Sequence, residues 1–243
     1  MGAQPEQAFL HFTAPVADPS WTILIPTLGQ RRELLKRLLD HLLPQLEPYQ
    51  HRFKVTALFN EGQWPMGVVR QKLLDGLDTD YMSFIDDDDM VADWYVAEVA
   101  TALSSEPEMV GWIAQCYSDG RPSYRAHHSL EYRDWSTPKR AKGKNAKLLY
   151  RDFSHTNVIR TDIAKLGRFD VTRPGEAEDL TWVQQLRGKL TRQVFVNKTM
   201  YHYYWSRTGS TWAQKYGNIS TGHQPLQVQH PCFSWHPEST WNL

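Results

Sequence analysis

Short apolar runs alternate with segments of helical periodicity over residues 22–114, and this alternation constrains the fold more than any other feature. Four runs have the length and composition of buried strands, at residues 22–26, 53–59, 81–85 and 109–114. The intervening segments place apolar residues at helical spacing, at residues 30–43, 65–77 and 94–103. Strands joined by helices in this way predict an α/β fold, with a mostly parallel, Rossmann-like central sheet and helices on both faces.

Local signals set several element boundaries. We expect Pro44 to end the first helix, because proline cannot donate a helical hydrogen bond. Asp119-Gly120 predicts a hairpin turn. A further helix over residues 176–186 begins with acidic residues, which suit its N-terminal end, and ends at Gly188. Later strands are predicted at residues 194–196 and 200–205. A small antiparallel portion is therefore expected after the parallel sheet.

The bulk composition argues for an ordinary globular domain. The chain has 27 Lys and Arg residues against 27 Asp and Glu, so no overall field attracts it to nucleic acid or to a membrane surface. No apolar stretch is long enough to span a bilayer, and residues 1–10 lack the features of a signal peptide. Cys116 and Cys232 are far apart and are expected to be free thiols. We therefore expect a cytoplasmic protein without a membrane span.

Four adjacent aspartates, Asp86 to Asp89, directly follow the third predicted strand. Like charges this close repel one another unless a cation neutralises them, and Mg²⁺ and Mn²⁺ prefer carboxylate oxygens. Polar clusters at residues 27–31 and 60–61 follow the first two strands. Because ligands bind at the carboxyl ends of parallel strands, the three clusters predict one site. The alternatives are a solvated acidic loop or a cluster of acids that caps the N-terminus of a helix.

Seven segments in this order resemble the family 2 glycosyltransferases of the GT-A fold, which are inverting enzymes with a DXD motif. They are Ile23-Leu-Ile-Pro-Thr27 with Arg31, Phe59-Asn-Glu-Gly62, Gly67-Val-Val-Arg-Gln71, Asp80-Tyr-Met-Ser-Phe-Ile-Asp-Asp-Asp-Asp89, Ser154-His-Thr-Asn157, Leu166-Gly-Arg-Phe-Asp170 and Gly175-Glu-Ala-Glu-Asp179. Two positions depart from the family pattern, because Asn60 replaces an aspartate and Gln71 replaces an asparagine. Both departures leave the nucleotide open.

The resemblance implies a donor site for a nucleotide-diphosphate sugar and a divalent cation, Mn²⁺ or Mg²⁺. The donor would contact Pro26, Thr27, Arg31, Asn60, Glu61, Arg70, Asp86 and Asp87. The metal ligands implied are Asp88, Asp86 and, after a late strand, His202. The sugar itself is not specified.

The resemblance also implies an acceptor side. Asp179 would be the catalytic base that takes the proton of an acceptor hydroxyl, and Glu178 would help to bind the acceptor. Taken without the resemblance, these two acids are ordinary charges of a first helical turn. The whole chain, 1–243, is then predicted to be one catalytic domain. It would have a nucleotide-sugar half at 20–115, an acceptor half at 116–205 and a Trp- and His-rich tail at 206–243.

Other functions remain open at this point. The same fold could serve as a non-catalytic module that binds sugar nucleotides or glycans. The basic segment 139–147 and the many aromatic residues also suit a nucleic-acid protein, either a carboxylate–metal nuclease or a glycosyltransferase acting on a modified DNA base. The acceptor could thus be a glycan, a small molecule or modified DNA, and the oligomeric state is not predicted.

Overall fold

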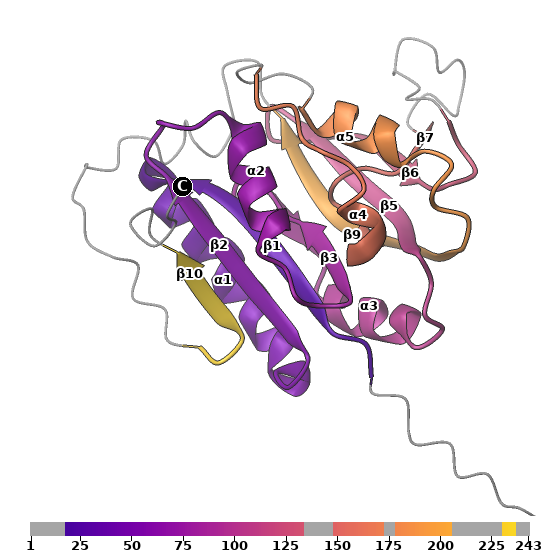
Figure 1. The fold of residues 1–243 in the computed structure, drawn as a ribbon, viewed down its shortest axis with the longest axis horizontal. Coiled ribbons are helices and arrows are strands. Elements are labelled where there is room, and N and C mark those ends of the chain that lie inside the picture. The colour runs from indigo at the N-terminus through magenta and orange to yellow at the C-terminus, as the bar shows by residue number, and fades with distance from the viewer. Residues whose placement is uncertain (1–17, 134–147, 173–177, 206–229, 237–243) are drawn as a thin grey trace, which may run out of the picture.

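A ten-stranded sheet runs through the computed structural model, which describes residues 18–133, 148–172, 178–205 and 230–236 (Figure 1). The strand order is β10-β2-β1-β3-β8-β5-β6-β7, and β9 pairs with both β5 and β4. The strands are β1 (Trp21–Leu28), β2 (Phe53–Asn60), β3 (Tyr81–Phe84), β4 (Met90–Val91), β5 (Met109–Ser118), β6 (Arg121–His128), β7 (Leu148–Arg151), β8 (Val158–Arg160), β9 (Gln193–Trp205) and β10 (Phe233–His236). The helices are α1 (Arg32–Leu46), α2 (Met66–Asp75), α3 (Tyr95–Leu103), α4 (Thr161–Ala164) and α5 (Glu178–Leu186), with short 3-10 turns η1 (Gly29–Arg31) and η2 (Glu47–Tyr49).

The sheet carries a hydrophobic core on each face. On β1, Ile23 and Ile25 pack into one core, whereas Leu24 packs into the other, because successive strand residues point to opposite faces. The apolar sides of α1 and α3 cover the first face, and those of α2, α4 and α5 cover the second. Figure 1 shows α1 on the far side of the sheet and α2 and α5 on the near side. The predicted α/β fold with helices on both faces is confirmed.

The first three strands are parallel, as predicted, since β1 pairs in parallel register with both β2 and β3. The fourth predicted strand does not join them directly. Instead β8 lies between β3 and β5 and is antiparallel to both. Nothing in the apolar pattern indicates this insertion. Its consequence is that the loop before β8 lies at the carboxyl end of β3, where Phe84 N donates a 3.1 Å hydrogen bond to His155 O.

The hairpin and the mixed half of the sheet follow β5. Asp119 and Gly120 have φ of 50° and 76° and connect β5 to the antiparallel β6, as their sequence predicts. β9 runs parallel to β5 along its length and antiparallel to the short β4. β9 is one continuous strand, so the prediction of two separate late strands is wrong. Pairing with β5 on both sides of a register shift, which falls between Val196 and Thr199, holds the two predicted segments in one strand.

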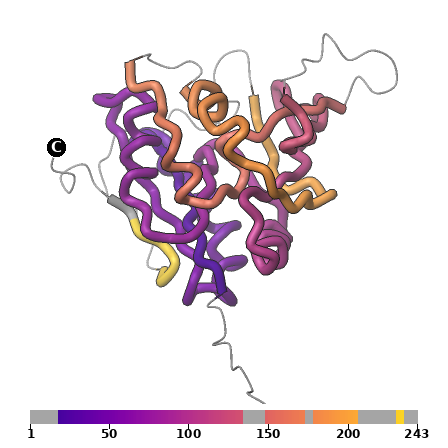
Figure 2. Tube along the Cα trace, turned by 45° about the vertical axis from the view of Figure 1, so that its right-hand side comes forward, coloured from indigo at the N-terminus to yellow at the C-terminus, as the bar shows by residue number. Residues whose placement is uncertain are grey.

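Two further expectations are corrected. Pro44 lies inside α1, which continues to Leu46. Because Pro44 is in the last turn, the lost hydrogen bond frees the carbonyl of Asp40, an exposed residue, so the cost is small. The aperiodic tail contains β10, which pairs in parallel with β2. In Figure 2 this strand, in yellow, lies beside the N-terminal half of the chain.

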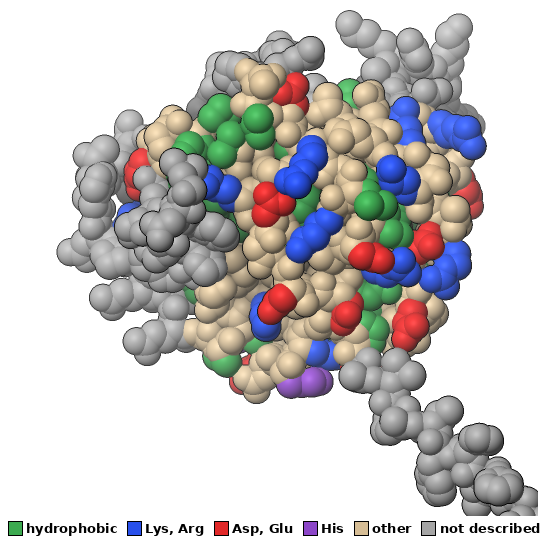
Figure 3. All heavy atoms as spheres, in the orientation of Figure 1, with side chains coloured by type: hydrophobic (Ala, Val, Ile, Leu, Met, Phe, Trp, Pro, Cys, Tyr) green, Lys and Arg blue, Asp and Glu red, His purple; other side chains and the backbone are tan. Residues whose placement is uncertain are grey.

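The surface agrees with the balanced composition. On the face shown in Figure 3, acidic and basic side chains are interspersed and form no patch of one sign. The basic segment 139–147 and most of the tail 206–243 lie outside the described residues. No helix in the described ranges combines the length and the apolarity that a membrane crossing needs.

Candidate active site

The four aspartates form a tight turn between β3 and β4, closed by a 3.1 Å hydrogen bond from Asp89 N to Asp86 O. A turn directs successive side chains outward in different directions, so the four carboxylates do not share one position. Asp87 and Asp89 are buried, whereas Asp86 and Asp88 are partly exposed. Each of the four has its own set of partners.

Asp86 binds cationic groups from two other elements. Arg70 Nη2, on α2, donates to Asp86 Oδ1 at 2.8 Å. His155 Nε2, in the loop before β8, lies 3.4 Å from Asp86 Oδ2. Burial alone would raise the pKa of Asp86, but Arg70 and His155 outweigh it and hold the pKa well below the usual value. Asp86 is therefore a carboxylate at neutral pH.

Asp87 faces the turn that follows β1. Thr27 Oγ1 donates to Asp87 Oδ2 at 2.6 Å, and Arg31 Nη1 donates to Asp87 Oδ1 at 2.9 Å. Burial, joined by the negative charge of Asp88, raises the pKa of Asp87 to about 6 in spite of these contacts. The structure thus brings together Thr27, Arg31 and the aspartate turn, which the sequence placed at two different strand ends.

Asp89 is held by β9. Its carboxylate accepts hydrogen bonds of 2.8 Å from both Tyr201 Oη and Tyr204 N. Burial, with the charges of Asp88 and Asp86, raises the pKa of Asp89 well above its usual value. These contacts fix the aspartate turn to the second half of the sheet, so Asp89 is a structural anchor.

Asp88 is the aspartate best suited to a cation. Its side chain is 16 % exposed and forms a 3.5 Å ion pair with Arg31. Burial, with the charges of neighbouring aspartates, raises the pKa of both Asp87 and Asp89, and a divalent cation beside Asp88 would offset negative charge in this turn. In the part of the chain that the structure describes, no three His, Cys, Asp or Glu side chains converge as a metal site.

The acidic start of α5 lies against the same cluster. Arg70 Nε donates to Glu178 Oε1 at 3.2 Å, so Arg70 bridges Glu178 and Asp86. His155 Nδ1 lies 3.1 Å from Asp179 Oδ2. Burial would raise the pKa of Asp179, but His155 and then Arg70 lower it to about 2. Figure 2 shows α5, in orange, beside the N-terminal half that carries α2.

A cavity of about 330 Å³ opens beside this cluster. Asp86, His155 and Asp179 form one wall, and aromatic side chains of β5, β6 and β9 form much of the rest. The aromatic lining consists of Tyr117, Tyr124, Tyr201, Tyr203 and Trp205. Such a cavity, with carboxylates on one wall and rings on the other, suits a ligand rich in hydroxyl groups and C–H faces.

Other predicted site residues lie less directly at the cluster. Pro26 is buried within β1, opposite Leu58. Asn60 is buried and uses its side chain within its own loop, where it donates to Trp64 O and accepts from Gly62 N and Trp64 N. Glu61 is exposed and approaches the backbone of Gly29, at the turn after β1. Asn60 thus shapes the loop that carries Glu61.

His202 points away from the aspartates. Tyr201 and Tyr203, its neighbours on β9, line the cavity, and strand alternation places His202 on the opposite side. Its Nδ1 lies 3.3 Å from Tyr117 Oη. Burial, with the nearby His41, lowers the pKa of His202. His202 therefore faces away from the cavity that Asp86 and Asp179 border.

His155 is the site residue to which the sequence assigned no role. It lies within the segment 154–157 that resembles the family, but no pattern of charge or spacing marks it. It contacts Asp86 and Asp179, two residues far apart in the chain. Only the placement of β8 beside β3 brings the three together.

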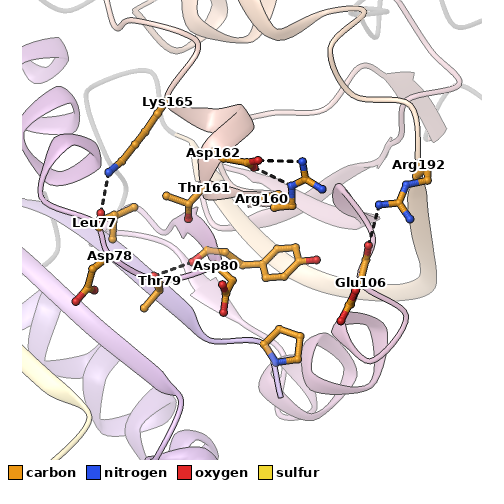
Figure 4. Close-up of a pocket in the computed structure, with 12 residues that line it drawn as sticks. Leu77, Asp78, Thr79, Asp80, Glu106, Arg160, Thr161, Asp162, Lys165 and Arg192 are labelled. Atoms are coloured by element: carbon orange, nitrogen blue, oxygen red, sulfur yellow. Dashed lines mark hydrogen bonds and ion pairs between the residues drawn. The ribbon is translucent and has the colours of Figure 1, made fainter. Parts of the chain in front are cut away.

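A larger cavity, of about 760 Å³, lies at the opposite end of the sheet (Figure 4). Asp80, at the start of β3, lines it, whereas the aspartate turn follows the end of that strand. Basic side chains in its walls have hydrogen-bond partners. Arg160 Nε donates to Asp162 Oδ1 at 2.7 Å, and Lys165 Nζ donates to the backbone oxygen of Leu77 at 2.7 Å. It contains none of the predicted site residues.

Comparison with known proteins identifies the fold. No protein-family model and no curated protein matches the sequence. The structure of S. aureus TarS 1–349 in complex with UDP-GlcNAc is similar, with a TM-score of 0.58 and 15 % identity, over 83 % of this chain and 61 % of that one. The complex of the same fragment with UDP has a TM-score of 0.57 and 15 % identity, over 77 % and 60 % of the two chains. A longer TarS structure has a TM-score of 0.54 and 15 % identity, over 76 % of this chain and 36 % of that chain. The chain therefore shares the fold of these TarS structures and spans about three fifths of the shorter ones.

Proposed function

We propose that this protein is an inverting glycosyltransferase that moves a sugar from a nucleotide-diphosphate sugar to an acceptor hydroxyl. One observation carries the proposal: donor-side Asp86 and base-side Asp179 lie at the two ends of His155 and border one cavity. The similar TarS structures hold UDP-GlcNAc and UDP, which supports a nucleotide sugar as the donor. The arrangement favours a catalytic protein over a binding module, which would need no base.

The donor would bind along the carboxyl ends of β1 to β3. Arg31 and Arg70 are the cations of this edge, and Arg70 Nη1 is a buried donor without a hydrogen-bond partner among the described residues. A diphosphate oxygen is the kind of acceptor that such a guanidinium group recognises. Asp88 would hold Mg²⁺ or Mn²⁺ together with the diphosphate. When bound, the cation would offset the charge that develops on the departing diphosphate.

The chemistry would take place in the cavity that Asp86 and Asp179 border. The acceptor would enter the aromatic cavity, where its hydroxyl oxygen attacks the anomeric carbon as the bond from that carbon to the diphosphate oxygen breaks. Asp179 takes the hydroxyl proton, and the nucleoside diphosphate leaves. With a pKa of about 2, Asp179 is ionised at neutral pH but is a weak base, so proton transfer must accompany bond formation rather than precede it. A single displacement inverts the anomeric carbon.

A donor-binding screen tests the first half of the proposal. The purified protein is heated with a panel of nucleotide sugars that includes UDP-GlcNAc, in Mn²⁺, Mg²⁺ or EDTA. A bound donor at 100 times its Kd should stabilise the fold by about 2.7 kcal/mol and raise the Tm. Asp88→Asn should remove the metal-dependent part of the shift, whereas Asp162→Asn, an exposed aspartate at the other end of the sheet, should behave as wild type. No shift with any donor would overturn the proposal.

The catalytic half is tested by Asp179→Asn. Donor hydrolysis, measured as release of the nucleoside diphosphate, should fall by about 10²- to 10⁴-fold, because the amide cannot accept the proton. The Kd of the donor should stay within threefold of wild type. If Asp179→Asn hydrolyses the donor as fast as wild type, Asp179 is not the base.

A further inference from the structure

His155 is the group that joins the two halves of the site. Its imidazole lies between Asp86 Oδ2, 3.4 Å from Nε2, and Asp179 Oδ2, 3.1 Å from Nδ1. Its side chain is only 10 % exposed. Asp86 follows β3, and Asp179 lies in the first turn of α5. The imidazole of His155 therefore contacts two elements that are far apart in the chain.

The backbone around His155 is firmly held. His155 O accepts from Phe84 N at the end of β3, at 3.1 Å. The fully buried Asn157 accepts from Ser154 N at 2.9 Å and donates from Nδ2 to Val110 O at 3.1 Å, which ties the loop to β5. The imidazole is therefore placed by the sheet itself, and it offers a fixed reference for groups that contact it.

The two ring nitrogens suit a bridging role. Nε2 faces Asp86 and Nδ1 faces Asp179. An imidazole carries a nitrogen on each side of the ring, so one side chain can contact two carboxylates at once.

Asp179 depends on this contact for one of its oxygens. Asp179 Oδ1 accepts from the neighbouring Leu180 N at 2.8 Å, while Oδ2 faces His155. The contact between His155 Nδ1 and Asp179 Oδ2 is an ion pair when the imidazole is protonated. Contacts of this kind commonly tighten when substrate binds.

We propose that His155 is a positioning residue: it fixes the carboxylate of Asp179 relative to Asp86, and so sets the base against the donor. The inference rests on the proposed function, since it assigns Asp179 the role of base. His155 acts through Asp179 and does not itself exchange a proton with the substrate. Its removal should therefore lower turnover while donor binding is preserved.

Two conservative variants separate the contacts of the two ring nitrogens. The side-chain amide of asparagine takes the position of Nδ1, so His155→Asn keeps a donor toward Asp179. The amide of glutamine takes the position of Nε2, so His155→Gln keeps a donor toward Asp86. The two variants differ by one methylene group, and His155→Ala removes both contacts.

The measurements are kcat for UDP-GlcNAc hydrolysis and the Kd of UDP-GlcNAc by calorimetry, both in Mn²⁺. His155→Ala should lower kcat about 100-fold, the cost of a misplaced catalytic group, with Kd within threefold of wild type. His155→Asn should recover kcat to within about tenfold of wild type, since it keeps the contact that positions the base. His155→Gln should remain as slow as His155→Ala. Equal losses in the Asn and Gln variants, or an unchanged kcat in His155→Ala, would overturn the inference.

A second measurement keeps the inference testable without turnover. If wild type neither binds nor hydrolyses UDP-GlcNAc, the donor assignment fails. The contact between His155 and Asp179 can still be tested through the stability of the protein. The Tm shifts of His155→Ala, Asp179→Ala and the double variant should then be non-additive, because each single variant removes the contact between the two side chains. Additive shifts would show that His155 does not hold Asp179, and the inference would fail on its own. The Tm of each single variant also reveals whether it folds.

Discussion

At the scale of single residues, position in a turn decides what each aspartate does. Four identical side chains in succession have four environments: Asp86 binds Arg70 and His155, Asp87 binds Thr27 and Arg31, and Asp89 is locked to β9. Their pKa values diverge accordingly, downward for Asp86 and upward for Asp87 and Asp89. Asp88 is partly exposed and has a 3.5 Å ion pair with Arg31. The predicted pair of Asp86 and Asp88 thus comprises two different kinds of group, one that pairs with cations of the chain and one suited to a metal.

A residue-scale prediction concerns His128, whose burial lowers its pKa to about 4. His128 Nδ1 donates to Asp152 O at 2.9 Å, so Nδ1 carries a proton whether the ring is neutral or charged. The folded state resists protonation, so the stability due to this residue is complete above pH 6.5 and is lost as the pH falls toward 4. The loss should be about 3 kcal/mol at pH 4.

Urea unfolding between pH 7 and pH 4 measures this loss. Other groups also titrate over this range, so the wild type is compared with His128→Asn, whose amide can replace Nδ1 but cannot be protonated. The wild type should lose about 3 kcal/mol more than His128→Asn over the range. His51→Asn, at an exposed histidine, should follow the wild type. Parallel curves for wild type and His128→Asn would contradict the prediction.

At the scale of elements, the site depends on how closely α2 approaches the segment before α5. A Cβ atom at Gly67 would lie 2.0 Å from Asp170 O and 3.5 Å from Glu178 Cβ. The helix that carries Arg70 can therefore reach Glu178 only because residue 67 has no side chain. The family resemblance assigned this segment to the start of a helix, and the structure supplies the packing reason for its glycine.

Gly67→Ala should destabilise the protein by about 1–3 kcal/mol, because the new methyl group meets backbone atoms that cannot move aside independently. The helix propensity of alanine alone would have the opposite sign, stabilising by up to about 1 kcal/mol. Chemical unfolding therefore distinguishes packing from propensity by the sign of the change. A variant as stable as wild type, or more stable, would show that α2 is not held against Asp170.

At the scale of the whole molecule, the C-terminal strand closes one edge of the sheet. Val55 N donates to Cys232 O at 2.6 Å, and Cys232 is buried in the core on the α1 face. Thr56 Oγ1 and Ser234 Oγ are 3.1 Å apart across the same pair of strands. β10 thus covers the edge of β2, which would otherwise present unpaired backbone groups.

Deletion of residues 230–243 should lower the Tm by roughly 5 °C and increase aggregation, because it exposes an eight-residue edge strand and part of the core. Calorimetry and light scattering measure the two effects. The matched control is deletion of residues 237–243, which leaves β10 intact and should change neither. If both deletions behave as wild type, β10 does not contribute to stability.

The sequence by itself determined the features that depend on local periodicity. Strands β1, β2, β3 and β5, helices α1 to α3 and the Asp119-Gly120 turn were predicted, because short apolar runs, helical spacing and turn chemistry are encoded within a few residues. The family resemblance added the donor and acceptor segments in their order. It also implied that the aspartate turn and Asp179 share one site. In the structure, Asp86 of that turn and Asp179 both contact His155.

Only the tertiary structure decided which distant segments meet. The insertion of β8 between β3 and β5, and the pairing of β10 with β2, depend on sheet edges that other parts of the chain leave open, and no local pattern records them. The same applies to the aspartate run: its sequence indicated excess negative charge, but the direction of each carboxylate follows from the turn and from partners many residues away. His155 gains its role in this way, because an ordinary histidine becomes a bridge only when β8 carries it to the end of β3.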